Sequence, residues 1–141
     1  TFAVASLAGA RARPLATAAL VLGIAGSALT VPGAWGAKQD YAGARDFVER
    51  SRAGDDVVVT IDMSEYAYQR YLEAGWPGIA TGDELERLER GGRRVWVLYT
   101  FPTRLAAIQP EIWAHLQREY RTAAEFPGTV GEGTIVVKVR E

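Results

Sequence analysis

The stretch EYAYQRY, residues 65–71, carries the most unusual side chains of this sequence. Tyr66 and Arg70 lie four residues apart, so on a helix they would share one face. A guanidinium can bind a phosphate through paired hydrogen bonds, and a tyrosine ring can stack on a sugar. We therefore predict a substrate-binding pair, Tyr66 and Arg70, with packing or contact with a membrane surface as the alternative. Tyr68 and Tyr71 would lie on the other face and pack against a sheet.

Asp62 is a second candidate, because it directly follows the apolar run VVVTI at residues 57–61. Catalytic groups of α/β folds often lie at the carboxyl end of such a strand. Asp62 and Glu65 also have the spacing of a capping box, in which the first side chain accepts hydrogen bonds at a helix start. The cap explains Asp62 without any chemistry, and we favour it.

The single histidine, His115, follows Glu111 by four residues on a predicted helix. The two side chains could ligate a metal ion together, but no third ligand is evident, so we expect His115 to face solvent. With one histidine and no cysteine, serine- or cysteine-based triads are difficult to build. We predict no catalytic residue, no metal site and no cofactor in this chain.

The pattern of apolar residues after position 38 indicates a mixed α/β domain. We expect the order α-β-α-α-β-α-β-β, with a parallel central pair of strands and an antiparallel closing hairpin. The last strand alternates apolar residues with Lys138 and Arg140, so one of its faces should be wet. The segment GTVGEGT at residues 128–134 reads as a hairpin turn rather than a phosphate loop, since it lacks the Lys-Ser/Thr ending. The main predicted elements are helices near 40–52, 64–74, 84–90 and 110–120, and strands at 57–61, 93–101 and within 121–140.

The starts of three of these helices have local sequence signals. Asp40 can cap the first helix, and Pro110 suits the first position of the last one. Thr81 and Glu84 have the spacing of a capping box at the start of the third helix.

Composition narrows the class of protein. The 141 residues leave room for about one domain. The net charge is −1, and since Arg11 and Arg13 are the charged residues before position 38, the remainder carries 14 basic and 17 acidic residues, a net of −3. Nucleic-acid binding usually needs a clustered basic face, so it is not expected here. The absence of cysteine excludes disulfides but leaves the redox compartment undecided.

The first 36 residues have the character of a membrane segment. Residues 15–31 carry no charge, and an uncharged helix of about 17–25 residues can cross a bilayer. Arg11, Arg13 and Pro14 would form a turn after another apolar segment, and positive charge places such a turn in the cytoplasm. Trp35 and Lys38 would then lie at the opposite interface. We expect residues 1–36 to span the membrane and residues 37–141 to form an extracytoplasmic domain.

Two other interpretations of the apolar stretch compete with a membrane span. A buried core helix is disfavoured because residues 15–31 have no polar face. A signal peptide fits the small residues of GAWGA, but the apolar residues before Arg11 argue against it. Either a span or a signal peptide would place the remainder outside the cytoplasm.

The motifs after the apolar helix resemble the C-terminal end of a known enzyme group. The stretches KQDYAGARDFVERSRAGDDVVV, YAYQRYL and RRVWVLY are similar to bacterial polytopic membrane glycosyltransferases of the family 39 type, which include protein mannosyltransferases and lipid A aminoarabinose transferases. The resemblance implies membrane helices followed by an extracytoplasmic α/β domain, and sugar transfer from a polyprenyl-phosphate carrier to an acceptor glycan, lipid or protein. The family's catalytic acidic residue lies in its first outer loop, which nothing here matches.

The resemblance therefore implies an accessory domain, inactive alone, that covers the membrane cavity and joins the last membrane helix through residues 35–41. The alternative is a membrane-anchored, non-catalytic binding or assembly module of the same shape. A free-standing secreted domain, with a mature N-terminus near position 38, is a further alternative.

Overall fold

The computed structural model describes residues 12–34, 39–128 and 131–141. The chain divides into two compact units, Thr1–Gly36 and Ala37–Glu141, and each is described by itself. Within the first unit, a 23-residue helix, α1, extends over Ala12–Ala34. Its side chains at 17–29 are all exposed. Over the part of the chain that the structure describes, no helix has both the length and the hydropathy of a membrane span.

The start of α1 corrects one sequence prediction. Arg13 and Pro14, expected in a turn, lie in the first turn of this helix. Proline is tolerated there because the first backbone N–H groups of a helix have no partner within it. The apolar segment predicted before Arg11, and the interfacial roles of Trp35 and Lys38, fall outside the described residues.

A mixed sheet forms the centre of the second unit, as the sequence predicts. Its strand order is β2-β1-β3-β5-β4. The first three of these neighbours are parallel, whereas β5 is antiparallel to both β3 and β4. The predicted parallel pair and closing hairpin are therefore confirmed. The strands are β1 (Val57–Ile61), β2 (Gly78–Ile79), β3 (Val95–Thr100), β4 (Arg121–Phe126) and β5 (Ile135–Arg140).

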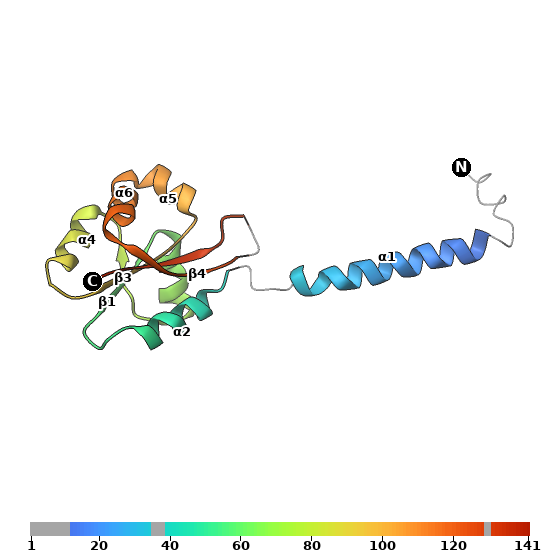
Figure 1. Ribbon diagram of the computed structural model, residues 1–141, viewed down its shortest axis with the longest axis horizontal. Coiled ribbons are helices and arrows are strands. Elements are labelled where there is room, and N and C mark those ends of the chain that lie inside the picture. The colour runs from blue at the N-terminus through green and yellow to red at the C-terminus, as the bar shows by residue number, and fades with distance from the viewer. Residues whose placement is uncertain (1–11, 35–38, 129–130) are drawn as a thin grey trace. The chain divides into compact units, whose positions relative to one another are not determined.

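Helices cover both faces of this sheet, with α4, α5 and α6 on one side and α2 on the other (Figure 1). The continuous apolar runs of β1 and β3 are typical of strands buried on both faces. Val59 and Val97 belong to the core under α4, α5 and α6, and Val58 and Trp96 belong to the core under α2. The helices are α2 (Tyr41–Ser51), α3 (Met63–Tyr66), the π-helix η1 (Ala67–Tyr71), α4 (Gly82–Glu89), α5 (Pro102–Ile108) and α6 (Pro110–Glu119).

Local capping explains where two of these helices begin. Asp40 Oδ1 accepts a hydrogen bond from the Gly43 N–H at 2.8 Å and so starts α2. Thr81 and Glu84 form the predicted capping box at α4. Tyr41, placed by the sequence at the end of a hinge, is the first residue of α2, and its ring packs edge-on against Tyr68 at 5.5 Å.

Strand β5 corrects the prediction of a wet face. Lys138 is 5% exposed, and Val136 on the same face is also buried. The strand lies between β3 and β4, and the Lys138 Nζ donates to the Tyr120 carbonyl oxygen at 3.5 Å. Burial lowers the pKa of Lys138, while the charge of Glu125 opposes that shift. The alternation of apolar and charged residues along β5 predicted one exposed face. The elements packed around the strand bury that face instead.

The two edge strands differ from the central ones. Strand β2 has two residues. Strand β4 pairs with β5 along its length, but its register shifts between Thr122 and Ala124. Such a bulge twists an edge strand and interrupts its ladder of hydrogen bonds.

Candidate functional site

The carboxyl ends of β1 and β3 form a topological switch point. From β1 the chain continues through α3 and η1 to β2, which pairs on one side of β1, and then through α4 to β3, which pairs on the other side. Ligands of open α/β sheets bind at the carboxyl edge where connections diverge in this way. Asp62 directly follows β1 at this edge, and Tyr66 and Arg70 lie in the connection from β1 to β2.

Tyr66 lies on an exposed surface made by a widened helical turn. The Leu72 N–H donates to the Ala67 carbonyl oxygen, five residues back, which defines the π-turn. This geometry brings the rings of Tyr66 and Tyr71, also five apart, to 5.6 Å in an edge-to-face contact. The hydrogen bond with Tyr66, followed by its charge, raises the pKa of Tyr71. The prediction that Tyr71 packs against the sheet is wrong, since this side chain is 73% exposed.

Tyr68 does pack as predicted. It is fully buried, with its ring centroid 4.9 Å from that of Trp76, and burial raises the pKa of its phenol. The hydroxyl of Tyr68 has no hydrogen-bond partner among the described residues. Tyr68 therefore anchors this segment to the core, which leaves Tyr66 and Tyr71 outside.

Arg70 is the charged group of this surface. It is exposed and makes no hydrogen bond or ion pair with any residue that the structure describes. Met63 and Tyr66, on the same segment of chain, are 51% and 63% exposed. The structure places both predicted residues, Tyr66 and Arg70, on one short exposed segment, although the ring of Tyr66 contacts Tyr71. We call Met63, Tyr66, Arg70 and Tyr71 the tyrosine–arginine surface.

Asp62 does not cap α3, so that prediction is wrong. Its side chain makes no capping hydrogen bond, and its backbone has φ 54° and ψ −130°. The carboxylate instead accepts a hydrogen bond from Arg104 Nε, on α5, at 2.9 Å. The hydrogen bond with Asp62, followed by its charge, raises the pKa of Arg104. The sequence spacing indicated a capping box, but the backbone turns the wrong way for one.

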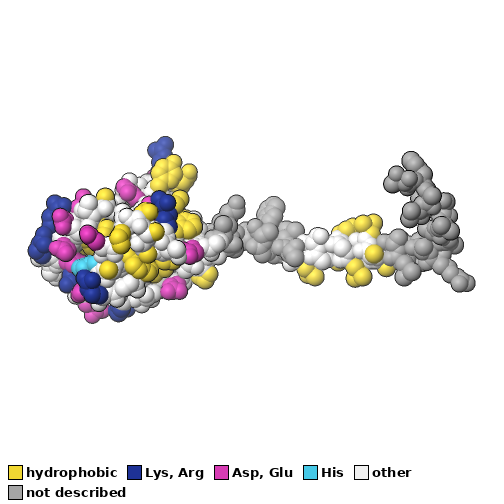
Figure 2. Space-filling view, turned by 90° about the horizontal axis from the view of Figure 1, so that it is seen from above, with side chains coloured by type: hydrophobic (Ala, Val, Ile, Leu, Met, Phe, Trp, Pro, Cys, Tyr) yellow, Lys and Arg dark blue, Asp and Glu magenta, His cyan; other side chains and the backbone are white. Residues whose placement is uncertain are grey.

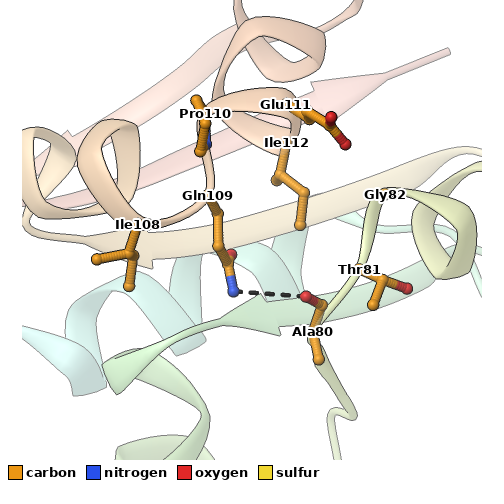
Figure 3. Close-up of a pocket in the computed structure, with 8 residues that line it drawn as sticks. All are labelled: Ala80, Thr81, Gly82, Ile108, Gln109, Pro110, Glu111 and Ile112. Atoms are coloured by element: carbon orange, nitrogen blue, oxygen red, sulfur yellow. Dashed lines mark hydrogen bonds between the residues drawn. The ribbon is translucent and has the colours of Figure 1, made fainter.

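A hollow of about 340 Å³ lies further along the same edge, beyond β2 (Figure 3). It lies between the start of α4 and the junction of α5 with α6. The Gln109 side chain reaches across and donates from Nε2 to the Ala80 carbonyl oxygen at 3.5 Å, a long contact (Figure 3). The Glu84 carboxylate accepts hydrogen bonds from the N–H groups of Ala80 and Thr81, and these bonds lower its pKa. The lining residues are Ala80, Thr81, Gly82 and Ile108–Ile112.

No pattern in the sequence indicates this hollow. The capping box at Thr81 and the proline at the start of α6 each indicated a helix start, but nothing indicated that the two meet. Their proximity follows from tertiary packing of α4 and α6 on the same face of the sheet.

A second polar centre surrounds Glu89, at the end of α4. Its side chain is 6% exposed. It accepts a hydrogen bond from the Tyr120 hydroxyl at 2.7 Å and forms an ion pair with Arg140 Nη1 at 2.9 Å. The His115 Nε2 lies 2.8 Å from Glu89 Oε1. Burial, followed by the hydrogen bond to Glu89, raises the pKa of Tyr120. Three side chains of the fold thus bind this carboxylate. A hollow of about 300 Å³ lies beside it, lined by Glu86, Glu89, Arg90, His115 and Arg140.

The prediction that His115 faces solvent is therefore wrong, because the ring is largely buried and contacts Glu89. The disfavoured metal-binding pair of His115 with Glu111 is not seen among the contacts of the described residues. The His115 side chain is 18% exposed, and its surface lies among acidic and basic side chains (Figure 2). No group of three or more His, Asp or Glu side chains within the described residues could hold a metal ion.

Comparison with protein-family models finds no match, and comparisons with curated proteins and with solved structures find none either.

Proposed function

We propose that this chain is the C-terminal part of a polytopic membrane glycosyltransferase that uses a polyprenyl-phosphate-linked sugar. In this proposal residues 1–36 belong to the membrane and residues 37–141 form an extracytoplasmic domain that assists catalysis but is inactive alone. The 17 uncharged residues at 15–31 support membrane attachment, and the motifs after them support the resemblance.

The tyrosine–arginine surface carries the proposal for substrate contact. Arg70 is exposed and has no partner among the described residues, and it shares a short segment with two exposed tyrosines, so it has no evident role in holding the fold. Arg70 would donate paired hydrogen bonds to the phosphate of the lipid carrier. Tyr66 and Tyr71 would offer aromatic surface to the sugar or to the first prenyl units.

An accessory role agrees with the state of the titratable groups. Three side chains of the fold bind the Glu89 carboxylate, and burial and the hydrogen bond to Glu89 raise the pKa of Tyr120. A general acid or base must reach its substrate within hydrogen-bond distance. The Glu89 centre therefore supports the fold rather than a reaction.

Binding of farnesyl phosphate, a short carrier analogue, tests this function. The 141-residue chain in neutral detergent is titrated with farnesyl phosphate and with farnesol, and amide NMR shifts are followed. We expect shifts around residues 63–71 with the phosphate alone. Arg70→Ala should weaken binding at least about tenfold, equivalent to 1.4 kcal/mol.

Arg50 on α2 provides the matched control, because it is also an exposed arginine without a partner among the described residues. Arg50→Ala should bind farnesyl phosphate as the parent chain does. Equal binding of farnesol and farnesyl phosphate, or equal loss in both arginine variants, would contradict the proposal. That result would favour the alternative of a membrane-anchored binding or assembly module.

A further inference from the structure

Asp62 adopts a backbone conformation that an aspartate rarely tolerates. Its φ of 54° and ψ of −130° lie outside the regions open to residues with a Cβ atom. Glycine reaches such conformations without steric cost. A residue held there is strained, and strain of this kind concentrates at ligand-binding and active sites.

The position of this strain is also informative. Asp62 forms the turn between β1 and α3, and a strained turn between a strand and a helix is how α/β enzymes raise a functional side chain above the sheet edge. Phe101, the first residue after the neighbouring strand β3, also has a positive φ, of 55°. The two central parallel strands thus both end in a strained residue at the switch point.

Structural roles do not account for the aspartate. It caps no helix. Its ion pair joins a side chain that is 16% exposed to Arg104, which is 51% exposed, and pairs of this kind contribute little to stability. Two residues further along the chain, the hydroxyl of the fully buried Ser64 lacks a hydrogen-bond partner among the described residues. That is unusual for a buried polar group.

The chemistry of the pair indicates the class of ligand. Asp62 accepts hydrogen bonds and Arg104 donates them, while their charges cancel. Such a pair favours neither an anion nor a cation, but it suits a neutral molecule with neighbouring hydroxyl groups, each both donor and acceptor. Tyr66, an exposed aromatic residue, follows Asp62 by four positions in the sequence.

We propose that Asp62 is a ligand-binding carboxylate that receives hydroxyl groups of a saccharide at the carboxyl end of β1. Arg104 is the positioning residue, and it donates to the carboxylate or to the same ligand. The choice of a saccharide as the ligand rests on the proposed glycosyltransferase function. The argument that Asp62 binds a ligand rests on backbone strain and is independent of that function.

Three substitutions of this pair test the proposal on the full 141-residue chain in neutral detergent. Melting temperature is measured, and amide NMR shifts are followed with methyl α-glucoside, methyl α-mannoside and methyl α-galactoside. Asp62→Gly should raise the melting temperature by a few degrees and abolish the saccharide shifts. Asp62→Asn keeps the strain, so it should lose binding at least tenfold without the gain in melting temperature. Arg104→Gln should weaken binding severalfold.

Glu73 supplies the control, since it is an exposed residue with a φ of 48°. Glu73→Gly should raise the melting temperature and leave saccharide binding unchanged. A lower melting temperature for Asp62→Gly, or unchanged binding in either Asp62 variant, would overturn the proposal. Absence of shifts in the parent chain with all three glycosides would overturn it as well.

These readouts separate this proposal from the proposed function. Loss of farnesyl phosphate selectivity would remove the lipid-carrier role of Arg70 and leave the Asp62 result standing. Failure of saccharide binding would remove Asp62 and leave the phosphate result standing.

Discussion

The Glu89 centre and the tyrosine–arginine surface contain similar residues in opposite states. Each combines tyrosine with arginine, but the partners of Glu89 come from other parts of the fold. His115 lies on α6, Tyr120 directly follows α6, and Arg140 lies on β5. Tyr66, Arg70 and Tyr71 come from one segment, α3 and η1. The two tyrosine rings contact each other, and Arg70 has no partner among the described residues. The same side chains therefore become structural where elements converge and stay available where a single segment stands at the surface.

The difference follows from the cost of burying charge. A carboxylate that is 6% exposed is tolerated because hydrogen bonds replace its lost hydration. An exposed guanidinium keeps its hydrating water and needs no partner from the protein. Its removal should therefore leave the stability of the fold almost unchanged. Substitutions should accordingly separate the two regions by their effect on stability.

Removing the central carboxylate should have the largest effect. Glu89→Ala leaves Arg140, Tyr120 and His115 without their shared partner, and we expect a loss of about 3–5 kcal/mol in the free energy of unfolding. Urea denaturation followed by circular dichroism measures this loss. Glu86→Ala, one turn earlier and exposed, should change stability by less than about 0.5 kcal/mol. Similar losses in the free energy of unfolding for the two variants would mean that Glu89 stabilises the fold no more than an exposed glutamate does.

Removing one donor from the same centre should cost less. Tyr120→Phe keeps the ring, which is 5% exposed, and deletes the 2.7 Å hydrogen bond to Glu89. A hydrogen bond to a charged group is worth about 1.5–3 kcal/mol, so the free energy of unfolding should fall by that amount. A stability equal to that of the parent chain would show that Glu89 is satisfied by Arg140 and His115 alone.

Lys138 lies between the two extremes, because it is buried but bonds to a carbonyl oxygen at 3.5 Å rather than to a carboxylate. Lys138→Met should stabilise the chain by about 1 kcal/mol at neutral pH. Since burial lowers the pKa of Lys138, the folded chain releases that proton before the unfolded chain does, and stability rises with pH up to about 10.4, the ordinary lysine pKa. The advantage of the variant should therefore shrink as pH rises toward that value, and a constant advantage would argue against a buried ammonium.

Substitutions on the exposed surface should have the smallest effect on stability. Tyr66→Ala and Arg70→Ala should each change the free energy of unfolding by less than about 0.5 kcal/mol, because their side chains add little to the core. Thermal unfolding measures this, together with the farnesyl phosphate titration. A loss of stability comparable with that of Tyr120→Phe would show that the surface is structural after all.

The elements with regular patterns could be predicted from sequence. Asp40 gave the start of α2, Thr81 and Glu84 gave the start of α4, and Pro110 gave the start of α6. The run VVVTI gave a strand covered on both faces. These signals are local, since a cap or a β-branched run depends on residues within a few positions.

The features that were missed depend on contacts distant in the sequence. Helix α5 and the two-residue strand β2 have no strong period of their own. The π-turn moved Tyr71 from the predicted buried face to the surface, and the pairing of Asp62 with Arg104 joins residues 42 positions apart. For the candidate site, the sequence therefore indicated Tyr66 and Arg70, and named Asp62 as a candidate explained by a helix cap. It did not indicate the tyrosine pair, the backbone strain at Asp62 or its pairing with Arg104.

The edges of the sheet have a consequence for how copies of the chain meet. An exposed edge strand is a template on which a second molecule can add its own strand. Here β2 ends after two residues, and the ladder of β4 is interrupted between Thr122 and Ala124. Neither edge offers a long regular row of free N–H and C=O groups. Copies of the chain should therefore not associate through strand addition, even at high protein concentration.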